Sequence, residues 1–157
     1  MIELVPVRRE EIENLATMIL DYWRELDEER DDPKQGDRDM DDAKRLLYEA
    51  ISRGDGVFWI TREDREIGFV EYSIARHWLR PEVMVGEITE IYVRPDERRG
   101  GSGREAVERI LGEMKTRGVA YATLATSVRN DTARRFSGGL GFQEDRIEMK
   151  RTLEPGS

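Results

Sequence analysis

The chain has 157 residues and a mass of 18.3 kDa, the size of one ordinary globular domain. It carries 26 basic and 34 acidic side chains, a formal charge of −8, so it lacks the basic footprint of a nucleic-acid binder. It contains no cysteine, which excludes a disulfide scaffold, a thiolate zinc site and a cysteine nucleophile. We expect a soluble, cytoplasmic protein without a membrane span.

The negative charge is confined to residues 1–60, which hold 17 acidic and 9 basic side chains, whereas residues 61–157 hold 17 of each. One interpretation is a solvated acidic surface that aids solubility, and the other is that the first part of the chain attracts a cation. The most acidic stretch is 27–39, where seven acids and three bases surround Pro33 and Gly36. This composition predicts a loop.

The first half of the chain is predicted to contain a strand, two helices and a hairpin. Apolar residues recur every three or four positions from Ile12 to Leu26 and from Ala43 to Ile51, the pattern of amphipathic helices. Two runs rich in β-branched and aromatic residues flank a charged turn. The predicted elements are a strand at 2–7, helices at 12–26 and 43–51, and strands at 57–61 and 67–75.

The second half is predicted to contain a strand–helix–strand crossover followed by a short helix and a last strand or strand pair. The predicted elements are a strand at 87–93, a helix from near Gly103 to Gly118, a strand at 120–126, a helix at 131–139, and one or two strands at 142–153. The order β-α-α-β-β-β-α-β-α-β indicates an α+β (mixed α/β) fold whose sheet is mostly antiparallel.

The most informative local pattern lies between the strand at 87–93 and the following helix, and reads Arg98-Arg99-Gly100-Gly101-Ser102-Gly103-Arg104. A helix start leaves unpaired N–H groups and a partial positive charge, small residues let an anion reach them, and arginines add charge-assisted hydrogen bonds. The turn is therefore built like a diphosphate cradle, although an ordinary glycine-rich connection has the same composition. Its spacing fits neither the Rossmann nor the P-loop pattern.

Three blocks follow one another in a characteristic order: Ile91-Tyr92-Val93-Arg94-Pro95, then Arg98-x-x-Gly101-x-Gly103, then Asn130-Asp131-Thr132-Ala133 with Leu140-Gly141-Phe142. Together they resemble the central strand, the [QR]-x-x-G-x-[GA] motif and the N-x-x-A…G-F segment of the GCN5-related N-acetyltransferases (GNAT family). The resemblance covers essentially the whole chain. It implies a GNAT-like fold with a central, mostly antiparallel twisted sheet of six to seven strands flanked by about four helices. It also implies a single N-acetyltransferase domain over residues 1–153, followed by a frayed tail at 154–157.

The resemblance implies acetyl-CoA as the acyl-donor cosubstrate, without a metal. The pantetheine arm would pair with the backbone of Ile91, Tyr92 and Val93, as a peptide adds to a sheet edge. The pyrophosphate would lie on the turn, and Asn130 would contact the cofactor from the other side of the cleft. The implied residues of that turn are Arg98, Arg99, Gly100, Gly101, Ser102, Gly103 and Arg104.

The implied reaction is acetyl transfer to a primary amine by direct attack on the thioester. A lysine-like amine has a pKa of about 10, so it must lose a proton first, and a carboxylate can take that proton. Glu87 and Glu90 are the candidates. Strand alternation predicts that they point to opposite faces, so that only one faces the acceptor. Alignment on the Arg98 motif favours Glu87, which matches a base glutamate of histone-type members.

One position departs from the family pattern. Members often carry a tyrosine, which protonates the leaving thiolate, where this chain has Ser137. A serine donates a hydrogen bond but is a poor proton donor. We therefore keep an alternative beside the enzyme: a non-catalytic acyl-CoA-binding or partner-binding module on the same fold.

The acceptor is expected to be a cation, because the first two helices and their connecting loop border the acceptor site in this family, and here that loop is the acidic stretch 27–39. A polyamine, an aminoglycoside-like amine and a peptide or protein amine all fit. We expect a small-molecule or peptide amine as the partner, with no nucleic acid and no membrane, and leave a homodimer open.

Overall fold

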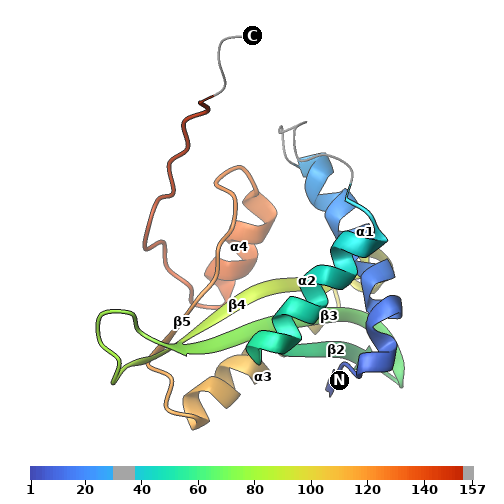
Figure 1. Cartoon of the computed structure of the whole chain (residues 1–157), viewed down its shortest axis with the longest axis horizontal. Coiled ribbons are helices and arrows are strands. Elements are labelled where there is room, and N and C mark those ends of the chain that lie inside the picture. Colours follow the sequence, from blue (N-terminus) through green and yellow to red (C-terminus); the bar gives the residue numbers. More distant parts are fainter. Residues whose placement is uncertain (30–37, 154–157) are drawn as a thin grey trace.

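A computed structural model of the chain describes residues 1–29 and 38–153 (Figure 1). Within these ranges it contains five strands, four α-helices and two short 3-10 helices. The strands are β1 (Glu3–Pro6), β2 (Gly56–Arg62), β3 (Arg65–Arg76), β4 (Met84–Val93) and β5 (Tyr121–Thr123). The helices are α1 (Ile12–Glu29), α2 (Met40–Arg53), α3 (Ser102–Thr116) and α4 (Asp131–Gly139), with η1 (Arg9–Glu11) and η2 (Pro95–Glu97).

The strands form one sheet in the order β1-β2-β3-β4-β5. The pairs from β1 to β4 are antiparallel, and β4 pairs with β5 in parallel after the crossover through α3. The mixed α+β class, the mostly antiparallel sheet and the predicted order of elements through α4 are therefore confirmed.

Two hydrophobic cores lie on opposite faces of the sheet. On one face, α1 and α2 pack against side chains such as Trp59, Phe69 and Tyr92. On the other, α3 packs against residues that include Val70 and Ile88. Figure 1 shows the helix pair α1 and α2 on one side of the sheet and α3 on the other. We call these the α1/α2 face and the α3 face.

Local signals explain where α2 begins and ends. Asp39 and Asp42 exchange side-chain-to-backbone hydrogen bonds of 3.0 Å, a reciprocal cap that satisfies two N–H groups at the helix start. Gly54 ends the helix with φ +83°, a backbone conformation that favours glycine. The helix is thus longer at both ends than the predicted 43–51.

The predicted number of strands was too high, because the sheet of the described residues has five strands instead of six to seven. β5 covers three residues of the predicted 120–126, since its pairing with β4 ends at Thr123. The predicted strand or strand pair at 142–153 is also wrong, as these residues form no regular element within the described chain. A strand requires a hydrogen-bonded neighbour, and the described part of the chain supplies none to this segment.

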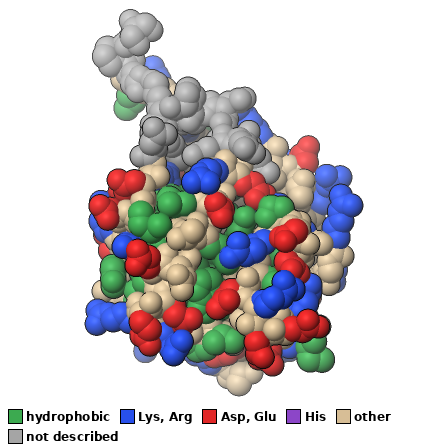
Figure 2. Space-filling model, turned by 90° about the vertical axis from the view of Figure 1, so that its right-hand side faces the viewer, with side chains coloured by type: hydrophobic (Ala, Val, Ile, Leu, Met, Phe, Trp, Pro, Cys, Tyr) green, Lys and Arg blue, Asp and Glu red, His purple; other side chains and the backbone are tan. Residues whose placement is uncertain are grey.

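The acidic loop predicted at 27–39 is only partly described. The backbone stays helical to Glu29, so the loop does not begin at residue 27. Residues 30–37, with most of the remaining acids of this stretch, lie outside the described residues, as does the predicted frayed tail at 154–157. On the side of the molecule that carries α1 and α2, acidic and basic side chains alternate with apolar ones (Figure 2). Of the helices in the described ranges, none combines the length and apolar character that a membrane crossing requires.

Candidate active site

The sheet opens between β4 and β5. The two strands pair only at Val85, Gly86 and Glu87, opposite residues 121–123. β4 continues to Val93, so its residues 88–93 have no strand partner on the β5 side within the described chain. Ile91, Tyr92 and Val93 lie at the end of this stretch. An unpaired strand edge presents backbone N–H and C=O groups to which an extended ligand can bind.

A bulge in β4 brings Glu87 and Glu90 to the same face of the sheet. Tyr72 on β3 pairs with Ile88, but Glu71 pairs with Glu90, so Thr89 is an extra residue. Its hydroxyl donates a 3.0 Å hydrogen bond to the carbonyl of Glu71. Because the extra residue shifts the alternation by one position, both glutamates lie on the α1/α2 face. The prediction that they point to opposite faces was therefore wrong.

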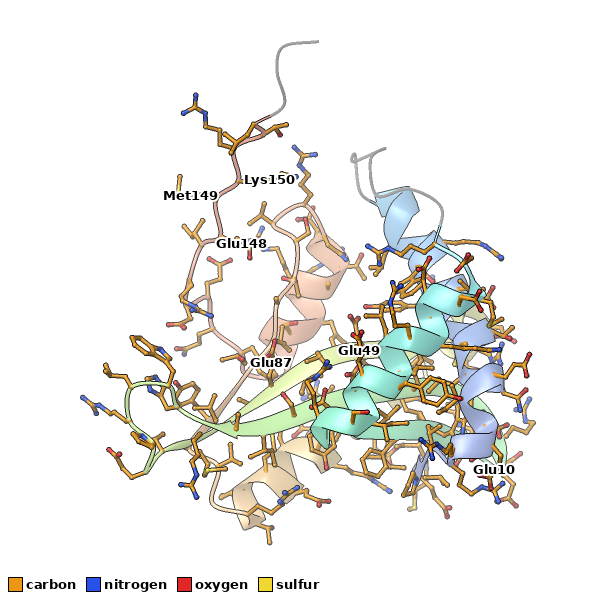
Figure 3. The ribbon with its side chains drawn as sticks, in the orientation of Figure 1. Glu10, Glu49, Glu87, Glu148, Met149 and Lys150 are labelled. Atoms are coloured by element: carbon orange, nitrogen blue, oxygen red, sulfur yellow. The ribbon has the colours of Figure 1, made fainter. Side chains whose placement is uncertain are left out.

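Glu90 is half-buried and belongs to a group of polar side chains on the α1/α2 face. The Tyr22 hydroxyl of α1 donates a short hydrogen bond to its carboxylate. Glu71 lies directly across on β3, and Arg53 approaches Glu71 at 3.9 Å. Burial, followed by the charges of Asp55 and Glu90, raises the pKa of Glu71 to about 7. Glu87 is exposed on the same strand (Figure 3).

The glycine-rich turn leads from the open end of β4 into α3. Arg99 and Gly101 both have positive φ, +73° and +76°. The helix begins at Ser102, and its first hydrogen bond runs from the N–H of Glu105 to the carbonyl of Gly101 at 2.9 Å. Apart from its neighbours along the chain, no atom of the described residues lies within 4 Å of the position that a Cβ on Gly101 would take. The turn therefore has room beside the N–H groups that start a 15-residue helix.

Arg98, the first residue of the turn, is held by α1. Its guanidinium donates two hydrogen bonds to Glu25, of 2.6 and 2.8 Å, and its Nε donates one of 2.8 Å to the carbonyl of Val93. It also lies over the Tyr92 ring, 5.5 Å from the centroid. Arg98 thus joins the end of α1 to the end of β4. Arg99 and Arg104, the other two arginines of the turn, are exposed.

Arg62, at the end of β2, contacts the other side of the turn. Its guanidinium donates a short hydrogen bond to the Ser102 hydroxyl and forms a 2.9 Å ion pair with Glu97. A Cβ on Gly100 would lie 3.1 Å from its Nη2. Sequence reasoning missed this residue, since nothing in the pattern around Arg62 marks it and the turn lies about forty positions further along the chain.

The third block of the motif forms α4, beside the start of α3. Asn130 caps this helix, with its Oδ1 accepting a 3.0 Å hydrogen bond from the N–H of Ala133. A Cβ on Gly103 would lie 3.5 Å from the Phe136 ring, which places α4 against the first turn of α3. Ser137 is buried at 8% exposure. The structure therefore brings α4 against the start of α3 through Phe136, while Asn130 caps α4 and Ser137 lies within it.

Comparisons with known proteins bear on the family and the fold of the chain. The model of the acetyltransferase (GNAT) family matches residues 17–142. The chain is 29% identical over 126 residues to a mycothiol acetyltransferase of Thermobispora bispora, a match that covers 76% of this chain. The matched part of the chain spans 40% of that relative's length.

Solved structures share the fold at low sequence identity. A possible acetyltransferase from Clostridium difficile 630 superimposes with a TM-score of 0.78 and 16% identity over 99% of both chains. The aminoglycoside N-acetyltransferase AAC(6')-Iy, solved in complex with CoA, gives a TM-score of 0.75 and 17% identity over 97% of this chain and 95% of its own.

Proposed function

Because the chain belongs to the acetyltransferase (GNAT) family, we propose that it transfers an acetyl group from acetyl-CoA to a primary amine of a cationic acceptor. The observation that carries the proposal is the continuity of two features: the unpaired residues 88–93 of β4 lead directly into the glycine turn at the start of α3. The unpaired strand edge suits the extended arm of a ligand, and the glycine turn suits an anionic group at the end of that arm. Acetyl-CoA has both parts and supplies the activated acetyl group.

The residues of the turn fit a diphosphate. The space beside Gly101 is open, and the N–H groups of the first turn of α3 are available to oxyanions. The exposed Arg99 and Arg104 add positive charge. Arg98 also bonds Glu25, and these two bonds fix the end of α1 beside the turn.

The acceptor side of the proposal rests on the carboxylates of the α1/α2 face. Glu87 and Glu90 lie on this face of β4, and Glu71 lies opposite Glu90. Negative charge attracts a protonated amine, and a fixed carboxylate takes its proton before attack. Glu90 suits the role of proton acceptor better than Glu87, because Tyr22 fixes its carboxylate while Glu87 is exposed. Glu87 then contributes to attracting the acceptor.

Departure of the CoA thiolate makes a modest demand on the protein. A thiol has a pKa of about 8.5, so the thiolate leaves near neutral pH without full protonation. A serine at position 137 is therefore compatible with turnover. The same residue supports the second candidate, a non-catalytic acyl-CoA-binding module, because Ser137 is a poor proton donor and is buried in α4.

A thiol-release assay with acetyl-CoA separates the two candidates. The panel contains polyamines, lysine peptides and aminoglycosides, since one structural neighbour is named for an aminoglycoside acceptor. We expect release with at least one cationic amine. If CoA raises the melting temperature of the protein but no amine of the panel causes thiol release, the binding module would be favoured.

The carboxylate assignment is tested with the best acceptor of that panel. We expect Glu90→Gln to lower kcat strongly, and Glu87→Gln to raise mainly the KM for the amine. Glu108→Gln, on the exposed side of α3, is the matched control. Equal effects of the two β4 variants on kcat would contradict the division of roles.

A further inference from the structure

Two carboxyl groups lie next to each other on the α1/α2 face of the sheet, one from β3 and one from β4. Glu71 and Glu90 are direct partners in the antiparallel register of these strands. Directly opposed residues have Cβ atoms about 4.5–5.5 Å apart. The Glu71 side chain is only 15% exposed, and Glu90 is half-buried. Two carboxylates so close together and so poorly hydrated are both ionised only at a large cost in free energy.

The charged groups between α2 and β2 favour the protonated form of Glu71. Arg53 donates hydrogen bonds of 3.3 and 3.0 Å to one carboxylate oxygen of Asp55, whereas it lies 3.9 Å from Glu71. Its positive charge is therefore largely balanced by Asp55, whose side chain is 9% exposed. Burial, then the negative charges of Asp55 and Glu90, outweigh the attraction of Arg53 and raise the pKa of Glu71.

Helix α1 favours the ionised form of Glu90. The Tyr22 hydroxyl donates its short hydrogen bond to the Glu90 carboxylate, and such a bond stabilises the charged group. The Tyr22 ring packs on the rings of Phe69 and Tyr92, with centroids 5.7 and 5.4 Å away, so the hydroxyl is held in place. The surroundings of the pair are thus unequal: they favour an ionised Glu90 beside a protonated Glu71.

We propose that Glu71 and Glu90 hold one proton between them at neutral pH, and that Glu71 is a positioning residue that keeps Glu90 ionised and sets its strength as a base. This rests on the proposed function, in which Glu90 takes the proton of the amine. In that step the N–H bond breaks, an O–H bond forms on Glu90, and the nitrogen lone pair attacks the thioester carbon. The C–S bond then breaks, and its electron pair leaves with the thiolate. When Glu71 also ionises at higher pH, its negative charge makes Glu90 a stronger base.

Carbon-13 NMR of the full chain, with glutamate labelled at the carboxyl carbon, follows both titrations without any need for turnover. The two signals are assigned by their loss in Glu71→Gln and in Glu90→Gln. We expect the Glu90 signal of the wild type to shift in two steps, the upper of which coincides with ionisation of Glu71, and in a single step in Glu71→Gln. Glu66→Gln, at an exposed position of the same strand, is the matched control and should leave both steps in place. A Glu90 signal with the same single step in the wild type and in Glu71→Gln overturns the proposal.

A second variant tests the sharing of the proton without changing either carboxyl group. Tyr22→Phe keeps the ring that packs on Phe69 and Tyr92 but removes the hydrogen bond to Glu90. The shared proton should then move toward Glu90, so that the upper step grows in the Glu90 signal and shrinks in the Glu71 signal. Unchanged step sizes in both signals would show that the two groups titrate independently, and sharing would be refuted.

The kinetic consequence is measured with the best acceptor of the amine panel, as the ratio of kcat/KM for the wild type to kcat/KM for Glu71→Gln. Titration of the amine cancels in this ratio, and glutamine has nearly the shape of a protonated glutamate. We expect a ratio near one at about pH 5.5 that rises roughly three- to tenfold by about pH 8.5, with the midpoint that NMR gives for Glu71. A ratio that does not change with pH overturns the proposal. Absence of turnover with every amine would instead contradict the proposed function, and the NMR titration would still decide whether the proton is shared.

Discussion

Arg62 is predicted to position the cofactor turn although it lies outside every motif. Its side chain, 27% exposed, bonds Ser102 at the start of α3 and pairs with Glu97. In Arg62→Ala both contacts disappear. Glu97 keeps an ion pair of 3.2 Å with Arg65, whereas among the described residues no other hydrogen bond holds the Ser102 hydroxyl. The first turn of α3 should therefore become less ordered, while the rest of the fold is unchanged.

The size of the effect follows from the bond that is lost. A hydrogen bond from a charged group contributes about 1.5–3 kcal/mol, and 1.4 kcal/mol corresponds to a tenfold change in an equilibrium constant. If the whole of this free energy is lost from binding of the diphosphate, the KM for acetyl-CoA rises by about ten- to a hundredfold. The kcat should change little, because Arg62 is remote from the carboxylates of the α1/α2 face.

The assay compares two acyl donors, acetyl-CoA and S-acetylpantetheine, which lacks the diphosphate. Arg62→Ala should weaken use of acetyl-CoA and leave kcat/KM for S-acetylpantetheine nearly unchanged. Arg65→Ala is the matched control, because Arg65 pairs with the same Glu97 but is 66% exposed and has no bond to Ser102. Equal losses with both donors would show a general structural defect, and no loss with either would refute the positioning role.

Three further predictions concern stability. Because burial raises the pKa of Glu71 from 4.5 to about 7, the wild type loses stability as the pH rises through that range, and Glu71→Gln should not. In thermal melts, the melting temperature of the variant should rise by several degrees relative to that of the wild type between pH 5 and pH 8. A difference between the two melting temperatures that does not change with pH would contradict this. Gly101→Ala should lower the free energy of unfolding in urea by about 1–2 kcal/mol, because Gly101 has a positive φ. Gly103→Ala should lower it little, because the new Cβ would make an ordinary 3.5 Å contact. Equal losses in the two variants would argue against backbone strain at Gly101. Gly68→Ala should cost about 3 kcal/mol or more, since its Cβ would lie 2.1 Å from the carbonyl oxygen of Tyr92, and a fully stable variant would be incompatible with this packing of β3 on β4.

Patterns within a single element were predicted well from the sequence. The three- and four-residue spacing identified α1, α2 and α3, and the glycine turn after Val93 was placed correctly at the start of α3. These features depend on residues that are neighbours along the chain, where periodicity and capping act directly.

Features that depend on pairing between elements were not predicted. The bulge at Thr89 follows from the register of β4 against Glu71 on β3, and alternation within β4 carries no trace of it. The contact of Arg62 with Ser102 joins segments that are distant in sequence. Likewise, the alternation around Met149 indicates a strand, but a strand forms only where a partner edge is present.

The bulge at Thr89 also divides β4 into two parts that are free to diverge separately during evolution. Loss of that one codon would turn Glu87 and Gly86 to the opposite faces of the sheet, while Ile91, Tyr92 and Val93 kept their orientation. A lineage could thus rebuild the proposed acceptor side by a single insertion or deletion and retain the proposed cofactor side unaltered.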